Sequence, residues 1–109
     1  STAAIHGAAR SEAYAASKGA IITMVRGLAV ELARYGITAN SIVPGWVETA
    51  MTSPRVGDPK FEDRVMKRVP LRRWGKPEDF AGIAVYLASD ASSYQTGEEF
   101  VIDGGYTRF

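Results

Sequence analysis

The sequence contains no cysteine among its 109 residues, which excludes a disulfide framework and any thiolate metal site. Acidic and basic residues nearly balance at a formal net charge of +1, so the overall charge indicates neither a nucleic-acid partner nor a membrane surface. No apolar run approaches membrane-spanning length, and the first residues lack a signal-peptide pattern. What remains, 46% apolar and 23% charged, is typical of an ordinary globular protein.

A helix is predicted from just after Ser11, which can cap its N-terminus, to about Arg34, where Gly36 can form a left-handed cap. The prediction rests on apolar residues that recur at steps of three and four, namely Ala20, Ile21, Met24, Leu28 and Leu32. Tyr14 and Lys18 are four residues apart, so both side chains lie on one face of this helix.

A phenol beside an ammonium group could act in proton transfer on this helix face. The positive charge of Lys18 favours phenolate, so the pKa of Tyr14 is expected to fall from its reference of roughly 10 toward a useful range. A tyrosine tuned in this way can exchange a proton with an alcohol or a ketone. The alternative is a tyrosine half in the core beside a solvated lysine, because this spacing is common by chance.

Two short parallel-type strands are predicted, over residues 38–43 and 99–103. Pro44 and Gly45 stop the first strand, and a glycine pair stops the second. In α/β sheets ligands bind beyond the carboxyl ends of strands, so we expect a cofactor at the loop after Val43. An ordinary strand-to-helix turn is the alternative for that loop.

The remaining segments follow from local signals. Residues 50–60 are expected to form a loop, and residues 61–69 a short amphipathic helix. Pro77 suits the first position of a third helix. The only histidine, His6, falls in a loop near the start; it could contact a substrate, but we interpret it as a surface residue without a catalytic role.

Several features occur together in a defined order. Ser1 lies thirteen positions before Tyr14, Lys18 follows the tyrosine by four, and the segments 37–49, 94–97 and 101–105 come after them. In this order and spacing, the chain resembles the C-terminal half of a short-chain dehydrogenase/reductase, of the type that includes beta-ketoacyl carrier-protein reductases and sugar dehydrogenases. The resemblance covers essentially all 109 residues. It implies an α/β fold: the last two strands, with flanking helices, of a Rossmann-type doubly wound parallel sheet.

The resemblance also implies an NAD(P)-dependent oxidoreductase that interconverts an alcohol and a ketone. Tyr14 would then be the general acid/base, Lys18 would lower its pKa and bind the nicotinamide ribose, and Ser1 would orient the substrate oxygen. The implied cofactor-binding residues are Tyr14, Lys18, Pro44, Gly45, Val47 and Thr49. NAD or NADP is the implied cofactor, without a choice between them, and no metal is implied.

The family's first half, with its glycine-rich phosphate turn, has no counterpart in these residues. We therefore expect residues 1–109 to be a partial single domain, the catalytic and substrate half of the fold, and to be inactive in isolation. The resemblance implies a small-molecule alcohol or carbonyl substrate, a cytoplasmic location, and a homotetramer or dimer. A truncated, non-catalytic assembly module is the alternative, and the intact mass of the protein would distinguish the two.

Residues 60–76 hold seven of the thirteen basic residues. In the family this segment is a lid over the substrate, so an anionic substrate or an acidic carrier protein is one interpretation. A solvated face is the other, and we favour it. No motif supports a nucleic-acid partner.

Overall fold

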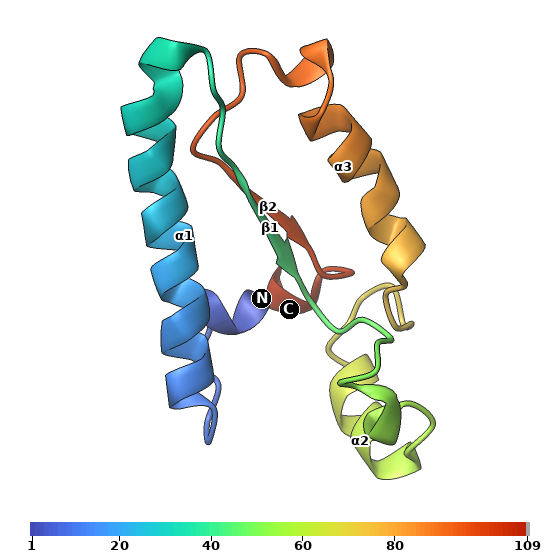
Figure 1. The fold of residues 1–109 in the computed structure, drawn as a ribbon. Coiled ribbons are helices and arrows are strands. Elements are labelled where there is room, and N and C mark those ends of the chain that lie inside the picture. Colours follow the sequence, from blue (N-terminus) through green and yellow to red (C-terminus); the bar gives the residue numbers. More distant parts are fainter. Residues whose placement is uncertain (109) are drawn as a thin grey trace.

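The fold is known from a computed structural model, which describes residues 1–108. Its helices and strands are α1 (Glu12–Leu32), β1 (Ser41–Pro44), α2 (Pro59–Met66), α3 (Ala81–Leu87) and β2 (Glu99–Ile102). The two strands pair in parallel, with Ser41 opposite Glu99 and Pro44 opposite Ile102. α1 and α3 flank this pair on opposite sides (Figure 1). The predicted α/β class, with two parallel strands and flanking helices, is confirmed.

The predicted side-chain cap of α1 is wrong. Ser11 has a backbone conformation (φ −137°, ψ 26°) outside the extended capping region, and its hydroxyl makes no capping bond. The carboxylate of Glu12 instead accepts a hydrogen bond from the Arg10 amide at 3.0 Å. At the other end a 3-10 turn (Ala33–Tyr35) leads to Gly36, whose φ of 72° confirms the left-handed cap. Neither α1 nor any other helix in residues 1–108 is long and apolar enough to cross a membrane.

The first strand is shorter than predicted, because its ladder begins at Ser41 rather than at residue 38. The side chain of Asn40 replaces the missing rungs. Its amide nitrogen donates to the carbonyl of Gln95 at 3.1 Å, and its oxygen accepts from the amide of Glu98 at 3.1 Å. Residues 38–40 therefore run beside the loop that precedes β2 without joining a ladder.

The second helix begins earlier than predicted. Asp58 caps α2, because its carboxylate accepts from the Lys60 amide at 2.9 Å, and Pro59 occupies the first turn. The helix ends at Met66, where the guanidinium of Arg72 donates to the next carbonyl, that of Lys67, at 2.7 Å. The expected loop over residues 50–60 is correspondingly shorter.

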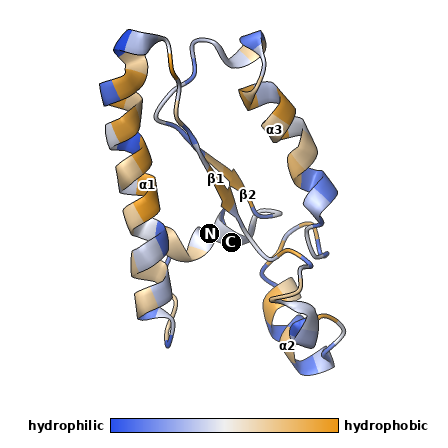
Figure 2. Cartoon of the chain, viewed as in Figure 1, coloured by the Kyte–Doolittle hydropathy of each residue, from blue (hydrophilic) through white to orange (hydrophobic). Residues whose placement is uncertain are grey.

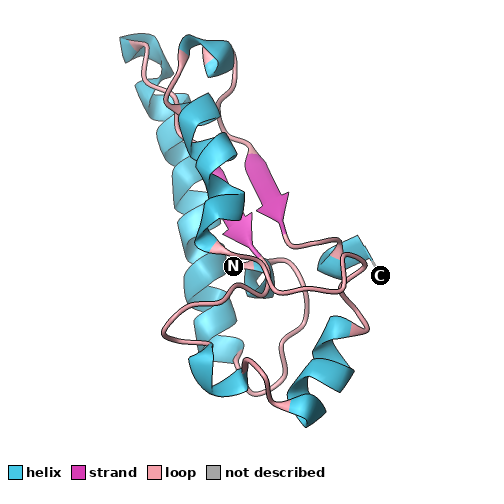
Figure 3. Ribbon diagram, turned by 90° about the vertical axis from the view of Figure 1, so that its right-hand side faces the viewer, coloured by secondary structure: helices cyan, strands magenta, loops and turns pink. Residues whose placement is uncertain are grey.

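The largest buried cluster lies against α2 rather than on the sheet. Its members are Val65, Val69 and Tyr106, with Trp46, Phe61 and Met66 packed against them. The ring of Trp46 makes edge contacts with Phe61 at 5.1 Å and with Trp74 at 6.0 Å between centroids. This aromatic packing fastens α2 to the chain segment that follows β1. Figure 3 shows that loops rather than strands connect the sheet to the neighbouring helices.

Much of the apolar surface of α1 stays uncovered. The accessible surface of 7350 Å² exceeds the roughly 5,900 Å² expected of a compact chain of this mass. Figure 2 shows hydrophobic residues along α1, and among them Ile21, Met24 and Val30 are 46%, 57% and 81% exposed. The described residues thus present an apolar helix surface larger than a compact domain usually leaves open.

The end of β1 makes a very close backbone contact. The amide of Gly45 donates to the carbonyl of Ile102 at 3.0 Å, which extends the strand pairing by one rung. A Cβ atom at Gly45 would lie 2.6 Å from Cβ of Asp103 and 2.7 Å from its Cα, distances that real contacts do not reach. Only glycine therefore fits at this point.

Replacement of Gly45 by alanine should lower the free energy of unfolding by about 1–3 kcal/mol, because the methyl group would push the strand ends apart. Gly82→Ala is the matched control, since nothing lies within 4 Å of that position, and alanine should be neutral or stabilising there. Urea unfolding measures both. Equal stability of Gly45→Ala and the parent would contradict the packing argument.

Candidate functional site

Tyr14 and Lys18 lie one turn apart near the start of α1, as their spacing requires. The Nζ atom of Lys18 is 5.4 Å from the centroid of the Tyr14 ring, within cation–π range. Tyr14 is 41% exposed, whereas Lys18 is half-buried. The phenol is therefore open to a substrate while the ammonium group is held against it.

Ser1 lies beside the helix that carries this pair. It precedes a 3-10 turn (Thr2–Ala4) that packs against α1, and its Oγ accepts from the amide of Ala3 at 3.2 Å.

Three of the predicted cofactor-binding residues share one groove. Pro44, Val47 and Thr49 line it together with Pro77 and Phe80, and its volume is about 370 Å³. The walls are almost entirely apolar. A flat aromatic ring fits this chemistry, because apolar walls can cover its face. Gly45, also predicted here, packs against Asp103 instead.

The segment that follows β1, residues 45–52, is called here the post-β1 loop. Thr52 holds it from inside. Its hydroxyl donates to the carbonyl of Val47 at 2.6 Å and accepts from the amide of Thr49 at 2.9 Å. The two threonine hydroxyls lie 3.3 Å apart. The sequence analysis missed Thr52, although a threonine three residues after Thr49 is a common signal of a side-chain-bonded turn.

Gly75 holds the same loop from outside. Its amide donates to the carbonyl of Trp46 at 2.8 Å, and its carbonyl accepts from the amide of Glu48 at 2.9 Å, which forms a short parallel bridge. A Cβ atom at Gly75 would lie 3.3 Å from the Trp46 oxygen and from a methyl group of Val47. The loop is therefore aligned by backbone hydrogen bonds to a partner without a side chain.

An ion pair between Arg73 and Asp79 closes the chain segment that contains Gly75. The guanidinium of Arg73 makes two hydrogen bonds to the carboxylate of Asp79, at 2.7 and 2.8 Å. The same carboxylate accepts from the Lys76 amide at 2.7 Å. These contacts close the segment from Arg73 to Asp79 into a fixed turn, with Gly75 inside it and the groove residue Pro77 on it.

Most of the basic residues in 60–76 make contacts within the chain. Lys67 pairs with Asp63 at 2.6 Å, and the guanidinium of Arg68 lies 4.6 Å from the ring centroid of Tyr106. The ring of His6 packs edge-on against the same Tyr106, at 5.4 Å between centroids. These contacts favour a structural role for the segment, and they make His6 a half-buried packing residue rather than a free loop residue.

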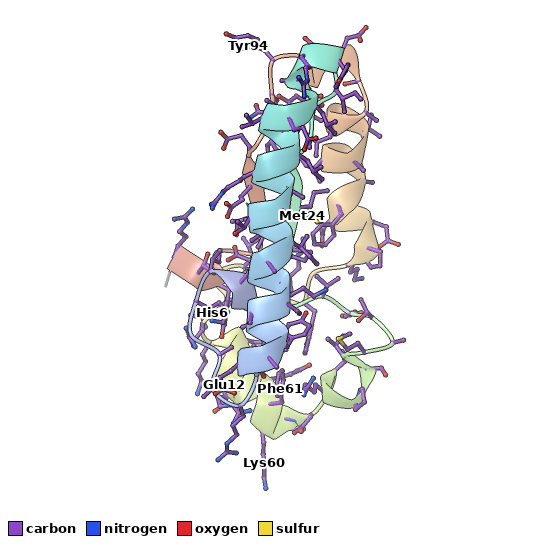
Figure 4. All side chains as sticks on the ribbon, turned by 60° about the vertical axis from the view of Figure 1, so that its left-hand side comes forward. His6, Glu12, Met24, Lys60, Phe61 and Tyr94 are labelled. Carbon is purple, nitrogen blue, oxygen red and sulfur yellow. The ribbon has the colours of Figure 1, made fainter. Side chains whose placement is uncertain are left out.

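The residues at the start of α1 and the residues of the groove occupy the same end of the molecule, but no hydrogen bond of the described residues links them. α1 runs antiparallel to the strands, so its first turns lie at the end where both strands finish (Figure 1), and Figure 4 shows Glu12 at that end and Tyr94 at the other. No hydrogen bond within residues 1–108 joins Ser1, Tyr14 or Lys18 to the groove. Residues 1–108 contain no cluster of acidic or histidine side chains suited to a metal ion.

Comparison with known proteins gives concordant matches. A family model described as enoyl-(acyl carrier protein) reductase matches residues 1–107. The 5-keto-D-gluconate 5-reductase of Escherichia coli strain K12 is 47% identical over 92 residues, which cover 84% of this chain and 36% of that protein. The chain thus spans little more than a third of the length of the curated relatives it matches.

Solved structures share the fold. A gluconate 5-dehydrogenase from Burkholderia cenocepacia, in complex with NADP and tartrate, is 42% identical with a TM-score of 0.84 and covers 88% of this chain and 38% of its own. A 4-hydroxyisoleucine dehydrogenase complexed with NADH is 33% identical with a TM-score of 0.96, over 100% of this chain and 45% of its own. The described fold therefore matches part of larger dehydrogenases, one of which was solved with NADP and the other with NADH.

The Arg73–Asp79 pair predicts a pH dependence. The hydrogen bonds from the Arg73 guanidinium, and then that from the Lys76 amide, hold the pKa of Asp79 far below its usual range. A carboxylate whose pKa is lowered on folding stabilises the fold above its unfolded pKa of about 4, and that contribution is lost as the pH falls.

Asp79→Asn should therefore be less stable than the parent at pH 7, and the difference should shrink progressively below about pH 4. Urea unfolding across this range measures the difference. Asp63→Asn, which breaks the exposed pair with Lys67, is the control and should change stability little at any pH. A gap between Asp79→Asn and the parent that persists unchanged into acid would contradict the assignment.

Proposed function

The chain belongs to the short-chain dehydrogenase/reductase family, and from this we propose that its residues are the catalytic and substrate-binding half of an NAD(P)-dependent oxidoreductase. The proposed reaction interconverts an alcohol and a ketone. The observation that carries the proposal is the tyrosine–lysine contact on α1, with Tyr14 partly exposed and the turn that follows Ser1 packed against the same helix. The alternative of a non-catalytic assembly module predicts no need for an accessible phenol at this place.

Each of the three side chains has a distinct task. In the reducing direction Tyr14 gives its phenolic proton to the carbonyl oxygen, and the tyrosinate that results regains a proton from water. Lys18 places its ammonium group 5.4 Å from the centre of the Tyr14 ring, and this group would donate to the ribose hydroxyls of the dinucleotide. Ser1 donates to the substrate oxygen and keeps it in line with the phenol. When bound, the dinucleotide supplies the hydride to the carbonyl carbon, or accepts it from the alcohol carbon in the reverse reaction.

The groove beyond β1 is the proposed nicotinamide site. Pro44 and Val47 would cover the ring, and Thr49 would bond the carboxamide, while Gly45 sets the course of the backbone through its contact with Asp103. NAD and NADP both remain candidates, since relatives of similar fold are known with NADH and with NADP. The names of these relatives support a small hydroxy or keto acid of the gluconate kind as substrate.

The exposed face of α1 supports an oligomer. Ile21 and Met24 are about half exposed and lie on the same stripe as Tyr14, so a second copy of the chain could cover them. We propose a cytoplasmic homotetramer or dimer in which this helix face and the last strand contact neighbouring subunits.

The activity is tested on the intact natural polypeptide that contains these residues. Oxidation of gluconate with NAD⁺ and NADP⁺, and reduction of 5-keto-D-gluconate with NADH and NADPH, are followed through the absorbance of the reduced dinucleotide. Turnover in either direction supports the proposal. Absence of turnover with these and a panel of simple alcohols and ketones, together with no dinucleotide binding, would leave the assembly module as the better reading.

Tyr14→Phe should reduce turnover about 10²–10⁴-fold while the fold is retained, because only the proton-transferring oxygen is removed. Tyr94→Phe is the matched control, because Tyr94 projects from the opposite end of the molecule (Figure 4) and should change nothing. Steady-state kinetics and circular dichroism measure both variants. Near-normal turnover of Tyr14→Phe would end its assignment as the acid/base group.

Lys18→Met should weaken dinucleotide binding, because the side chain can no longer donate hydrogen bonds to the ribose hydroxyls. Lys60→Met removes an equal charge from the tip of the molecule, where Figure 4 shows the side chain in solvent, and should leave the dissociation constant of the dinucleotide unchanged. Isothermal titration calorimetry measures both variants, and an unchanged dissociation constant in Lys18→Met would mean that the lysine is a surface residue.

A further inference from the structure

The start and the end of the described chain lie side by side, and two aromatic side chains join them. Figure 1 shows the N- and C-terminal ends next to each other, and Figure 4 shows His6 beside the C-terminal turn. The ring of His6 packs against that of Tyr106 at 5.4 Å between centroids, with 62° between the ring planes. An edge-to-face contact of this kind is favourable beyond the surface that it buries. It connects the segment that carries Ser1 to the segment that follows β2.

The segment of residues 1–6, called here the Ser1 turn, is held together by hydrogen bonds, and His6 stands at its end. The amide of His6 donates to the carbonyl of Thr2 at 3.2 Å, and Thr2 itself is buried. The Nδ1 atom of His6 lies 2.9 Å from the carbonyl oxygen of Gly7, and since a carbonyl can only accept, Nδ1 is the donor. Both the backbone and the ring of His6 are therefore oriented, and a force on the ring is passed to the turn.

Tyr106 is a firmly held partner for this contact. It is 6% exposed and belongs to the buried cluster against α2. The guanidinium of Arg68 lies 4.6 Å from its ring centroid, and Trp46 makes an edge contact with the same ring at 6.4 Å between centroids. Because the Tyr106 ring is fixed from several segments, loss of its contact with His6 should free the Ser1 turn rather than displace the tyrosine.

We propose that His6 is a positioning residue for Ser1: its ring, seated against Tyr106, holds the Ser1 turn where the serine hydroxyl reaches the substrate oxygen. The proposal rests on the proposed function, in which Ser1 donates to that oxygen. The packing of the 3-10 turn Thr2–Ala4 against α1 gives the Ser1 turn one point of support, and Tyr106 gives it a second. Without the second, Ser1 would be correctly placed for a smaller fraction of the time, and turnover would fall by that fraction.

The experiment is a double-mutant cycle on the intact natural polypeptide. Its variants are Ser1→Ala, His6→Ala and the two combined, with His6→Phe as the variant that keeps an aromatic ring. Tyr94→Ala is the matched control, because it removes a fully exposed ring at the opposite end of the molecule (Figure 4). The kcat/KM is measured with 5-keto-D-gluconate, or whichever carbonyl compound the parent reduces, in incubations long enough for slow variants. Calorimetric titration gives the dissociation constant of the dinucleotide, and circular dichroism reports the fold.

His6→Ala should lower kcat/KM about threefold to tenfold, the factor by which one aromatic contact favours the placed turn. His6→Phe should recover most of this loss. In the Ser1→Ala background, His6→Ala should have no further effect, because no hydroxyl is left to position. The dissociation constant of the dinucleotide should stay at the parent value throughout, as should kcat/KM in the Tyr94→Ala control. Should His6→Ala fail to fold, His6→Leu, which removes the ring but keeps an apolar contact, takes its place in the cycle.

An equal loss from His6→Ala with and without the Ser1 hydroxyl would overturn the positioning role, since His6 would then act on the substrate or on the fold directly. An unchanged kcat/KM in His6→Ala, or no recovery in His6→Phe, would overturn it too, and each of these results leaves the proposed function intact. Full turnover by Ser1→Ala would overturn the role of Ser1 together with this inference and leave the assignment of Tyr14 in place. Absence of turnover by the parent would overturn the proposed function and this inference together.

Discussion

The parallel pairing of β1 with β2 is the constraint on which the other features depend. Its last rung, from Gly45 to Ile102, brings the two strand ends so close that Cβ of Asp103 fills the space a side chain at Gly45 would need. Asp103 is fixed in turn. Its carboxylate is partly desolvated, yet hydrogen bonds from Thr107 and from the Gly105 amide keep its pKa below the usual value. The starting point of the post-β1 loop is thus defined by backbone contact.

After Gly45, the post-β1 loop is held mainly by hydrogen bonds to its backbone, and few side chains take part. Gly75 aligns it through two backbone hydrogen bonds, and the Thr52 hydroxyl closes it from within. α2 is attached in a different way, through the rings of Trp46 and Phe61 and through Glu62, which accepts from the Trp74 indole at 2.9 Å. The post-β1 loop and α2 therefore rest on two kinds of interaction, backbone pairing and side-chain packing.

The sequence pattern correctly predicted features that depend on neighbouring residues along the chain. The spacing of Tyr14 and Lys18 placed both on one helix face, and Gly36 marked the helix end, because helical periodicity and positive φ are read directly from the sequence. Pairings between distant segments leave no such period. The bonds of Asn40 to the loop before β2 shortened the first strand, and the bridge from Gly75 to the post-β1 loop was invisible, since a glycine gives no sign of what its backbone binds. The role proposed for Thr49 came from family resemblance rather than from pattern.

The unequal attachment of the post-β1 loop and α2 has an evolutionary consequence. Backbone hydrogen bonds survive most substitutions, so mutations that accumulate around the loop leave its geometry nearly constant as long as Gly45 and Gly75 are kept. Packing among Trp46, Phe61 and Trp74 responds to every change of ring size, and each such change would tilt or shift α2. Single substitutions during evolution can therefore change the position of α2 while the geometry of the post-β1 loop stays nearly constant. Related proteins can differ in the surface that α2 presents and still share the same loop.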